Sequence, residues 1–120
     1  MALRGVRGAT LLTADDAAQM QEAVAELVGE MMSRNDVDEA RIVSIIFTAT
    51  PDIHSGFPAA AARALGFHDV PLLCAQEIDV TGAVPFAIRV LMHADLPQER
   101  AEVQHVYLRG AEVLRRDLQK

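Results

Sequence analysis

The sequence predicts an α+β fold, in which a mixed β-sheet packs with one long helix and several short helices. The predicted elements are strand, helix, strand, short helix, strand, strand and short strand, an order typical of that class. The segment Ile42–Thr50 (IVSIIFTAT) is almost continuously apolar, which indicates a strand buried on both faces. One long helix cannot cover both faces of such a sheet, so we expect copies of the chain to cover the second face in a homo-oligomer.

The composition indicates one domain that binds no polyanion. With 120 residues, of which 51% are hydrophobic, the chain has the size and apolar content of a single domain spanning residues 1–120. Its formal net charge of −6 argues against nucleic-acid binding, which depends on excess positive charge. All of the 11 basic residues except Lys120 are arginines, which suit two-point contacts to carboxylates. A small anionic ligand therefore remains compatible with the sequence.

Several classes of protein are disfavoured by features that the sequence lacks. Its single cysteine excludes an intrachain disulfide, and the start MALRGVRGATLL does not resemble a signal peptide, so we expect a cytoplasmic protein. No apolar run approaches the roughly 20 residues that span a bilayer, so we expect no membrane insertion. The four histidines and the cysteine do not have metal-ligand spacing. We therefore predict neither a metal nor a cofactor.

The first predicted strand covers Leu3–Leu12. Its residues alternate imperfectly, and Gly5 and Gly8 indicate places where another backbone or a ligand comes close. Arg4 and Arg7 are three residues apart and therefore point to opposite faces of a regular strand. At most one of them can face a given site, and either could simply be a solvated arginine of an edge strand.

A single amphipathic helix follows and runs to Arg34. Thr13, followed three residues later by Asp16, resembles a capping box at its start, and Asn35 and Asp36 are suitable terminators. Its apolar stripe, at helical spacing, consists of Met20, Val24, Leu27, Val28 and Met31. We expect this stripe to form core.

Pro51 ends the predicted strand Ile42–Thr50, and a loop leads from there to a short helix. Pro58 suits the first position of that helix, AAAARAL, and Gly66 can close it. Arg63 is its only charged residue. Taken alone, Arg63 is explained equally well as a surface arginine.

The next two strands are Val70–Ile78 and Phe86–Ala94, connected by the turn residues of 79–85. They look like neighbouring strands of a hairpin, although the connection is long enough that direct pairing is not assured. Pro97–Glu102 can form a helical turn, and His105–Leu108 is a short last strand.

Charged residues inside this apolar strand pair need a physical reason. Alternation divides the second strand into two faces, Phe86, Ile88, Val90 and Met92 on one and Ala87, Arg89, Leu91 and His93 on the other. Arg89 therefore projects from the middle of a sheet, where an unpaired guanidinium is costly. Its partner is either Glu77 on the adjacent strand, as a structural ion pair, or a negatively charged ligand.

Five segments, RGVRGAT, TATPDIHSGFPA, CAQEIDVTG, IRV and HVYLRGAEVLRRDL, resemble the monofunctional chorismate mutases of the AroH class in order and spacing, over nearly the whole chain. The resemblance implies a trimer with a barrel-like core and three active sites at the clefts between neighbours. It implies conversion of chorismate to prephenate, toward phenylalanine and tyrosine, by an intramolecular Claisen rearrangement. Such a reaction needs no metal, nucleophile or proton transfer, but it needs a held conformer and stabilised negative charge.

The resemblance also implies roles for individual residues. Arg89 contacts the ether oxygen and one carboxylate, while Arg7 and Tyr107 bind the side-chain carboxylate. Glu77 orients the substrate hydroxyl and balances Arg89. Cys74 lies beside that hydroxyl or the developing charge, although a small buried hydrophobic residue explains it as well.

Further substrate contacts are implied for residues at the edge of the site. Phe57 packs on the ring, Arg63 and Arg115 close the mouth, and Leu72 and Leu73 contribute to substrate binding. Many family members have threonine where this chain has Leu73, and lysine where it has Ala60, so we expect weaker substrate binding rather than lost chemistry. Arg4 and Arg116 receive no role.

The spacing of two of these residues limits the roles that they can share. Cys74 and Glu77 are an odd number of residues apart, so both can line one site only if the strand bulges or ends there.

The alternatives to a mutase are a non-catalytic trimer that senses small dicarboxylates and an imine-deaminating trimer of similar outline. Glu77 among the arginines favours the mutase, because simple anion capture needs no carboxylate.

Overall fold

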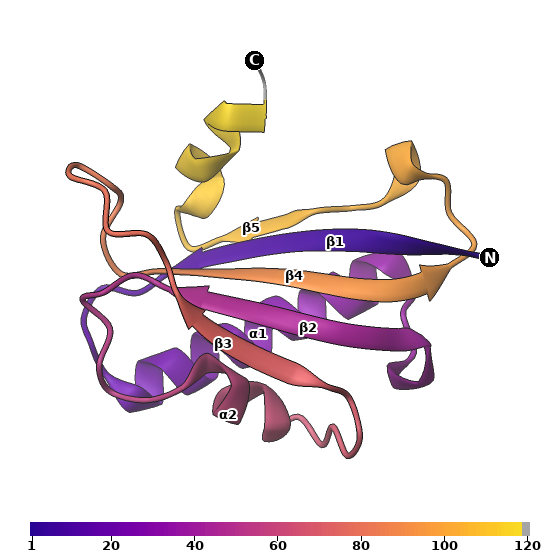
Figure 1. The fold of residues 1–120 in the computed structure, drawn as a ribbon, viewed down its shortest axis with the longest axis horizontal. Helices are drawn as coiled ribbons and strands as arrows, with labels where there is room; N and C mark the ends of the chain where they lie inside the picture. Colours follow the sequence, from indigo (N-terminus) through magenta and orange to yellow (C-terminus); the bar gives the residue numbers. More distant parts are fainter. Residues whose placement is uncertain (119–120) are drawn as a thin grey trace.

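The computed structural model describes residues 1–118, which form a five-stranded sheet with two α-helices on one face (Figure 1). The strands are β1 (Ala2–Leu11), β2 (Ile42–Ala49), β3 (Leu72–Gln76), β4 (Ala87–Leu96) and β5 (Val106–Leu108). The helices are α1 (Ala17–Asn35) and α2 (Pro58–Arg63). Three 3₁₀-helices complete the description: η1 (Glu39–Arg41), η2 (Arg100–Glu102) and η3 (Ala111–Leu118).

The sheet is mixed, as predicted, but its strand order corrects one expectation. The order is β3-β2-β4-β1-β5, with β4 antiparallel to β1 and β2, β3 parallel to β2, and β5 parallel to β1. The predicted hairpin-like pairing of β3 and β4 is therefore wrong, because β2 lies between them. The long connection lets β4 pass β2 at little entropic cost, whereas a two-residue turn would have forced direct pairing.

Helix α1 begins one turn later than the predicted capping box. Its N-cap is Asp16, whose carboxylate accepts the backbone N–H of Gln19 at 2.8 Å, while Thr13 instead bonds the Gln19 side chain. At the other end Asp36 adopts the left-handed conformation, with φ of 53°, that ends many helices. Helix α2 has Pro58 in its first turn, as expected.

The core lies between the sheet and α1. The predicted apolar stripe of α1 is fully buried, and so is the inner face of β4, formed by Ile88, Val90, Met92, Ala94 and Leu96. Gly8 lies where β1 packs tightly against α1, because a Cβ atom there would collide with the side chain of Met31. The close neighbours are side chains of α1, rather than the backbone or ligand that we expected near this glycine.

The second face of the sheet is not covered by either α-helix (Figure 1). In β2, Ile45 and Phe47 are buried on the inner face, while Ile46 and Thr48 on the opposite face are only half-buried and Val43 is exposed. The predicted burial of β2 on both faces is therefore not achieved within residues 1–118.

Neither helix of the described chain is long and apolar enough to cross a membrane.

Candidate active site

The sheet register places the chemically distinctive residues in one row across the open face. Arg89 on β4 is paired with Thr48 on β2 and with Ala9 on β1, and Ala9 is paired with Tyr107 on β5. Arg7 lies two residues before Ala9 on β1 and so shares its face. The small side chain of Ala9 separates the larger groups. Backbone pairing thus brings four strands together at one place.

Glu77 reaches this row from beyond the end of β3. Its backbone N–H donates to the carbonyl of Ala49 at 2.9 Å, which extends the β2–β3 pairing by one residue. Its Oε1 lies 2.9 Å from Nε of Arg89, and Thr48 Oγ1 donates to the same oxygen at 3.1 Å. The predicted Glu77–Arg89 pair is therefore confirmed, although it forms across β2 rather than between adjacent strands.

A cavity of about 1060 Å³ lies over this row. Arg7, Thr48, Glu77, Arg89 and Tyr107 supply its polar groups. Its apolar wall comes from the β3–β4 connection and from η3, through Ile78, Val80, Ala83, Val84, Val113 and Leu114. Ile78 is 82% exposed, so this wall has a large uncovered surface. The cavity therefore has a cationic floor and an apolar rim.

Arg115 and Arg7 each contact a residue at the β5 end of the cavity. The guanidinium of Arg115 lies 5.5 Å from the ring centroid of Tyr107, in cation–π contact. The backbone N–H of Arg7 donates to Nδ1 of His105 at 3.0 Å. Burial lowers the pKa of His105, and the positive charges of Arg7 and Arg115 lower it further. The contact of His105 is thus with the backbone that carries Arg7.

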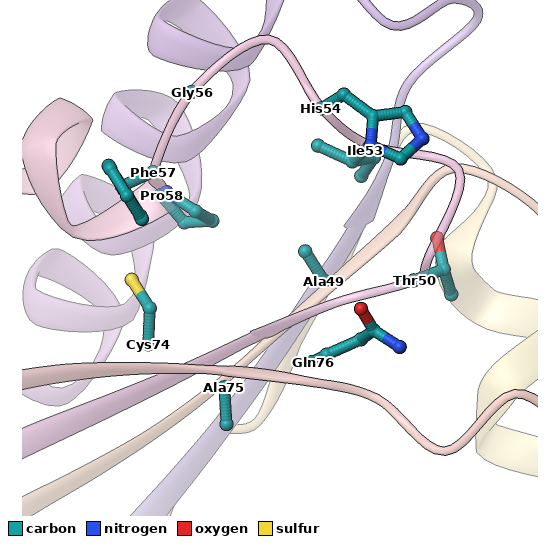
Figure 2. A pocket seen from close by; sticks show the side chains of 10 residues that line it. All are labelled: Ala49, Thr50, Ile53, His54, Gly56, Phe57, Pro58, Cys74, Ala75 and Gln76. Carbon is teal, nitrogen blue, oxygen red and sulfur yellow. The ribbon is translucent and has the colours of Figure 1, made fainter.

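Phe57 and Cys74 lie in a different, smaller cavity of about 290 Å³ (Figure 2). The Sγ of Cys74 points toward the start of α2 and accepts the backbone N–H of Ala59 at 3.3 Å. That N–H is one of those that a helix leaves unpaired in its first turn. The strand ends at Gln76, and Cys74 and Glu77 line different cavities of the chain.

The loop that carries Phe57 is held by an acidic residue from outside the sheet. The carboxylate of Asp15 accepts the backbone N–H groups of His54 and Ser55, both at 2.9 Å. These hydrogen bonds lower the pKa of Asp15. Phe57 itself is 74% exposed, so its ring is presented outward rather than buried in the chain's own core.

The remaining predicted residues lie outside both cavities. Arg63 is exposed on α2, Leu73 is exposed on β3, and Leu72 packs against the hydrophobic core. The structure thus groups Arg7, Tyr107, Glu77 and Arg89 in one cavity, with Arg115 at its edge, and Phe57 and Cys74 in another.

The sequence interpretation missed Thr48 and the apolar wall of the larger cavity. Within IVSIIFTAT, threonine is a polar residue that alternates with the buried Phe47, and that spacing is the signal that could have identified it. The wall could not be predicted in this way, because it depends on how the connection after β3 folds back over the sheet.

The larger cavity can bind an anion that also carries a hydroxyl group. Nε of Arg89 lies 2.9 Å from Oε1 of Glu77, and no hydrogen bond from its Nη groups is found among residues 1–115, the part of the chain whose side chains the structure describes. The Nη groups are therefore available to a ligand carboxylate or ether oxygen. No cluster of three or more potential metal-ligating side chains is found in the same part of the chain.

Comparison with known proteins identifies the family. The profile for chorismate mutase type I matches residues 3–118. The chain belongs to the type I chorismate mutases. It is 44% identical to the chorismate mutase AroH of Thermus thermophilus, over 98% of this chain and 97% of that protein. It is 40% identical to the AroH of Bacillus subtilis strain 168, over 98% of this chain and 94% of that protein.

A solved relative supports the fold of this chorismate mutase family member. A chorismate mutase from Clostridium thermocellum superimposes with a TM-score of 0.89 at 40% identity, over 91% of this chain and 97% of that one. The resemblance seen in the five sequence segments is therefore confirmed, and so is the mixed-sheet α+β architecture.

Proposed function

We propose that this protein is a chorismate mutase, an isomerase that converts chorismate to prephenate in phenylalanine and tyrosine biosynthesis. The observation that carries the proposal is the Arg89–Glu77 pair on the floor of the larger cavity, 2.9 Å apart, with Arg7 and Tyr107 beside it. A dianionic substrate needs cations, and its hydroxyl needs an acceptor. This cavity supplies both in one place.

The rearrangement breaks an ether C–O bond and forms a C–C bond within one molecule, so the protein has no covalent step to perform. Two tasks remain, which are to hold the compact conformer and to stabilise negative charge on the ether oxygen. The Nη groups of Arg89 can donate to that oxygen and to a carboxylate, while Arg7 and Tyr107 hold the second carboxylate. Glu77 accepts the substrate hydroxyl.

The other half of the site comes, in this proposal, from a neighbouring copy of the chain. Phe57 packs on the substrate ring and Cys74 lies near the hydroxyl, with Arg63, Leu72 and Leu73 contributing from the same side and Arg115 closing the mouth beside Tyr107. Phe57 and Leu73 are 74% and 61% exposed in the single chain, which suits residues that meet another surface.

We therefore propose a homotrimer with a barrel-like core and active sites between subunits. The uncovered second face of the sheet supports it, because Ile46 on that face of β2 is only half-buried in the single chain. A closed ring of three identical chains joins two different surfaces of each subunit, here the Arg89 side of one and the Phe57 side of the next. Residues 1–120 then act as one domain, and the free thiol of Cys74 is compatible with the reducing cytoplasm.

The experiment that tests the activity is to add the purified protein to chorismate, follow the loss of chorismate absorbance and identify the product. Formation of prephenate at a rate proportional to protein concentration supports the proposal. Binding of chorismate without turnover would instead assign the protein to the sensor class, and turnover of imines alone would assign it to the deaminases.

A further inference from the structure

We propose that Thr48 is a positioning residue of the active site, which holds the Glu77 carboxylate so that one of its oxygens faces the substrate. The inference rests on the proposed function, since it assigns Glu77 to the substrate hydroxyl. The family resemblance assigns no role to Thr48. Thr48 nevertheless lies in the row of the site, directly opposite Arg89 on the neighbouring strand.

Glu77 needs such a support because of its place in the chain. It follows the last residue of β3, and β2 separates it from the strand that carries Arg89. Its side chain must therefore extend over β2 to reach Arg89, and the residue beneath it there is Thr48. The Glu77 side chain is only 19% exposed, so its orientation is decided by these neighbours rather than by solvent.

Two contacts converge on one oxygen of the carboxylate. Thr48 Oγ1 donates to Oε1 at 3.1 Å, and Arg89 Nε lies 2.9 Å from the same atom. Because both contacts fall on Oε1, Oε2 is left to accept a hydrogen bond from a ligand hydroxyl. An ion pair supplies attraction, whereas a directed hydrogen bond fixes which way the carboxylate faces.

Threonine suits this task better than a more flexible donor. Its β-branched side chain has few rotamers on a strand, so the hydroxyl is held in one direction at little further entropic cost. Its backbone groups take part in the pairing with β4 and β3. Valine has nearly the same shape without the donor, and serine keeps the donor without the methyl group. The two substitutions therefore separate hydrogen bonding from packing.

The test compares Thr48→Val with Thr48→Ser in steady-state turnover of chorismate. We expect Thr48→Val to lower kcat/KM by about tenfold, the scale of one hydrogen bond to a charged group, and Thr48→Ser to remain within about threefold of the parent protein. In a Glu77→Ala background, Thr48→Val should cause no further loss, because the group that it positions is gone. An equal loss in both backgrounds would show a packing role and overturn the inference, as would full activity of Thr48→Val.

Crystal structures of the two variants give a result that does not depend on turnover. We expect the Glu77 carboxylate to change its orientation in Thr48→Val and to keep it in Thr48→Ser. An unchanged carboxylate in Thr48→Val would overturn the inference, even if the protein turns over chorismate. If the parent protein is inactive on chorismate, the proposed function fails, and the carboxylate orientation still decides whether Thr48 positions Glu77.

Discussion

The backbone N–H of Arg7 donates to Nδ1 of His105 at 3.0 Å, and this contact requires a neutral imidazole. A ring nitrogen that accepts a hydrogen bond carries no proton, so the proton of His105 must be on Nε2. Burial lowers the pKa of His105 from its usual 6.5, and the charges of Arg7 and Arg115 act in the same direction. Protonation of His105 therefore works against the contact that connects Arg7 to the segment before β5.

We predict that stability falls as the pH decreases below about 6.5 and that His105 contributes to this loss. The folded pKa is lower than the unfolded one, so the unfolded chain takes up its proton first on acidification. The stabilisation is fully present above the unfolded pKa and is lost as the pH falls through the folded pKa. Denaturant unfolding at fixed protein concentration, at about pH 7.5 and about pH 5.5, measures the loss.

His105→Gln isolates this contribution from that of other titrating groups. The amide oxygen of glutamine can accept from Arg7 but does not titrate, so the variant should lose less stability between the two pH values. Equal losses in the parent protein and in His105→Gln would assign the pH dependence to other residues.

We predict that Arg89→Lys lowers kcat far more than it raises KM. Arg89 is mid-strand and 44% exposed in its side chain, with Nε beside Glu77, so only its forked Nη groups can reach a carboxylate and an ether oxygen together. Lysine offers one point charge. If the charge on the ether oxygen exists mainly in the transition state, the loss in kcat is on the order of 10²-fold, or roughly 3 kcal/mol.

Arg34→Lys is the matched control for this substitution. Arg34 pairs with Glu30 on the exposed side of α1 at 3.0 Å, far from the cavity, so its replacement should leave kcat and KM unchanged. Circular dichroism should show that both variants are folded. A raised KM with nearly intact kcat in Arg89→Lys would make Arg89 a ground-state anchor.

Glu77→Gln should keep the fold while lowering kcat by about tenfold. The amide oxygen can still accept from Thr48, and the amide can still contact a hydroxyl, but it no longer balances the charge of Arg89. Steady-state kinetics beside Glu30→Gln, which neutralises a surface carboxylate of similar pairing, measures the effect. If Glu77→Gln turns over chorismate as fast as the parent protein, the negative charge is irrelevant.

The orientation of side chains on each strand could be predicted from the sequence, because alternation is local. It placed Arg89 on the face opposite Ile88 and Val90, and the structure confirms that division. It also separated Arg4 from Arg7: Arg4 donates from Nε to the carbonyl of Gln98 at 2.9 Å, while Arg7 lines the larger cavity.

Strand order and the division of the site could not be predicted in the same way. Pairing of β2 between β3 and β4 depends on contacts distant in sequence, which periodicity does not encode. The odd spacing of Cys74 and Glu77 did indicate that a regular strand cannot bring them to one cavity. In the structure the strand ends after Gln76, and the two residues line separate cavities.

Because the two halves of the proposed site lie in separate cavities of one chain, we predict that two variants, each inactive alone, restore activity when they assemble in one trimer. Arg89→Ala removes the cation of one half of the site. Phe57→Asp places a carboxylate in the other half, where it repels a dianionic substrate, and the 74% exposure of Phe57 means that the fold tolerates the change. Sedimentation should give the mass of a trimer for the parent protein and for each variant. A parent protein that is monomeric and fully active would rule out sites between subunits.

Co-expression of the two variants measures whether each site takes its halves from neighbouring subunits. In randomly mixed trimers, a site joins an intact Arg89 side to an intact Phe57 side about one time in four, so about a quarter of the parent activity per site should return. The matched control is Arg89→Ala co-expressed with Glu77→Ala. Both of those changes lie in the same half, so no mixed trimer contains an intact site and no activity should return. If Arg89→Ala with Phe57→Asp also stays inactive, although differently tagged subunits co-purify, both halves of each site must come from one chain.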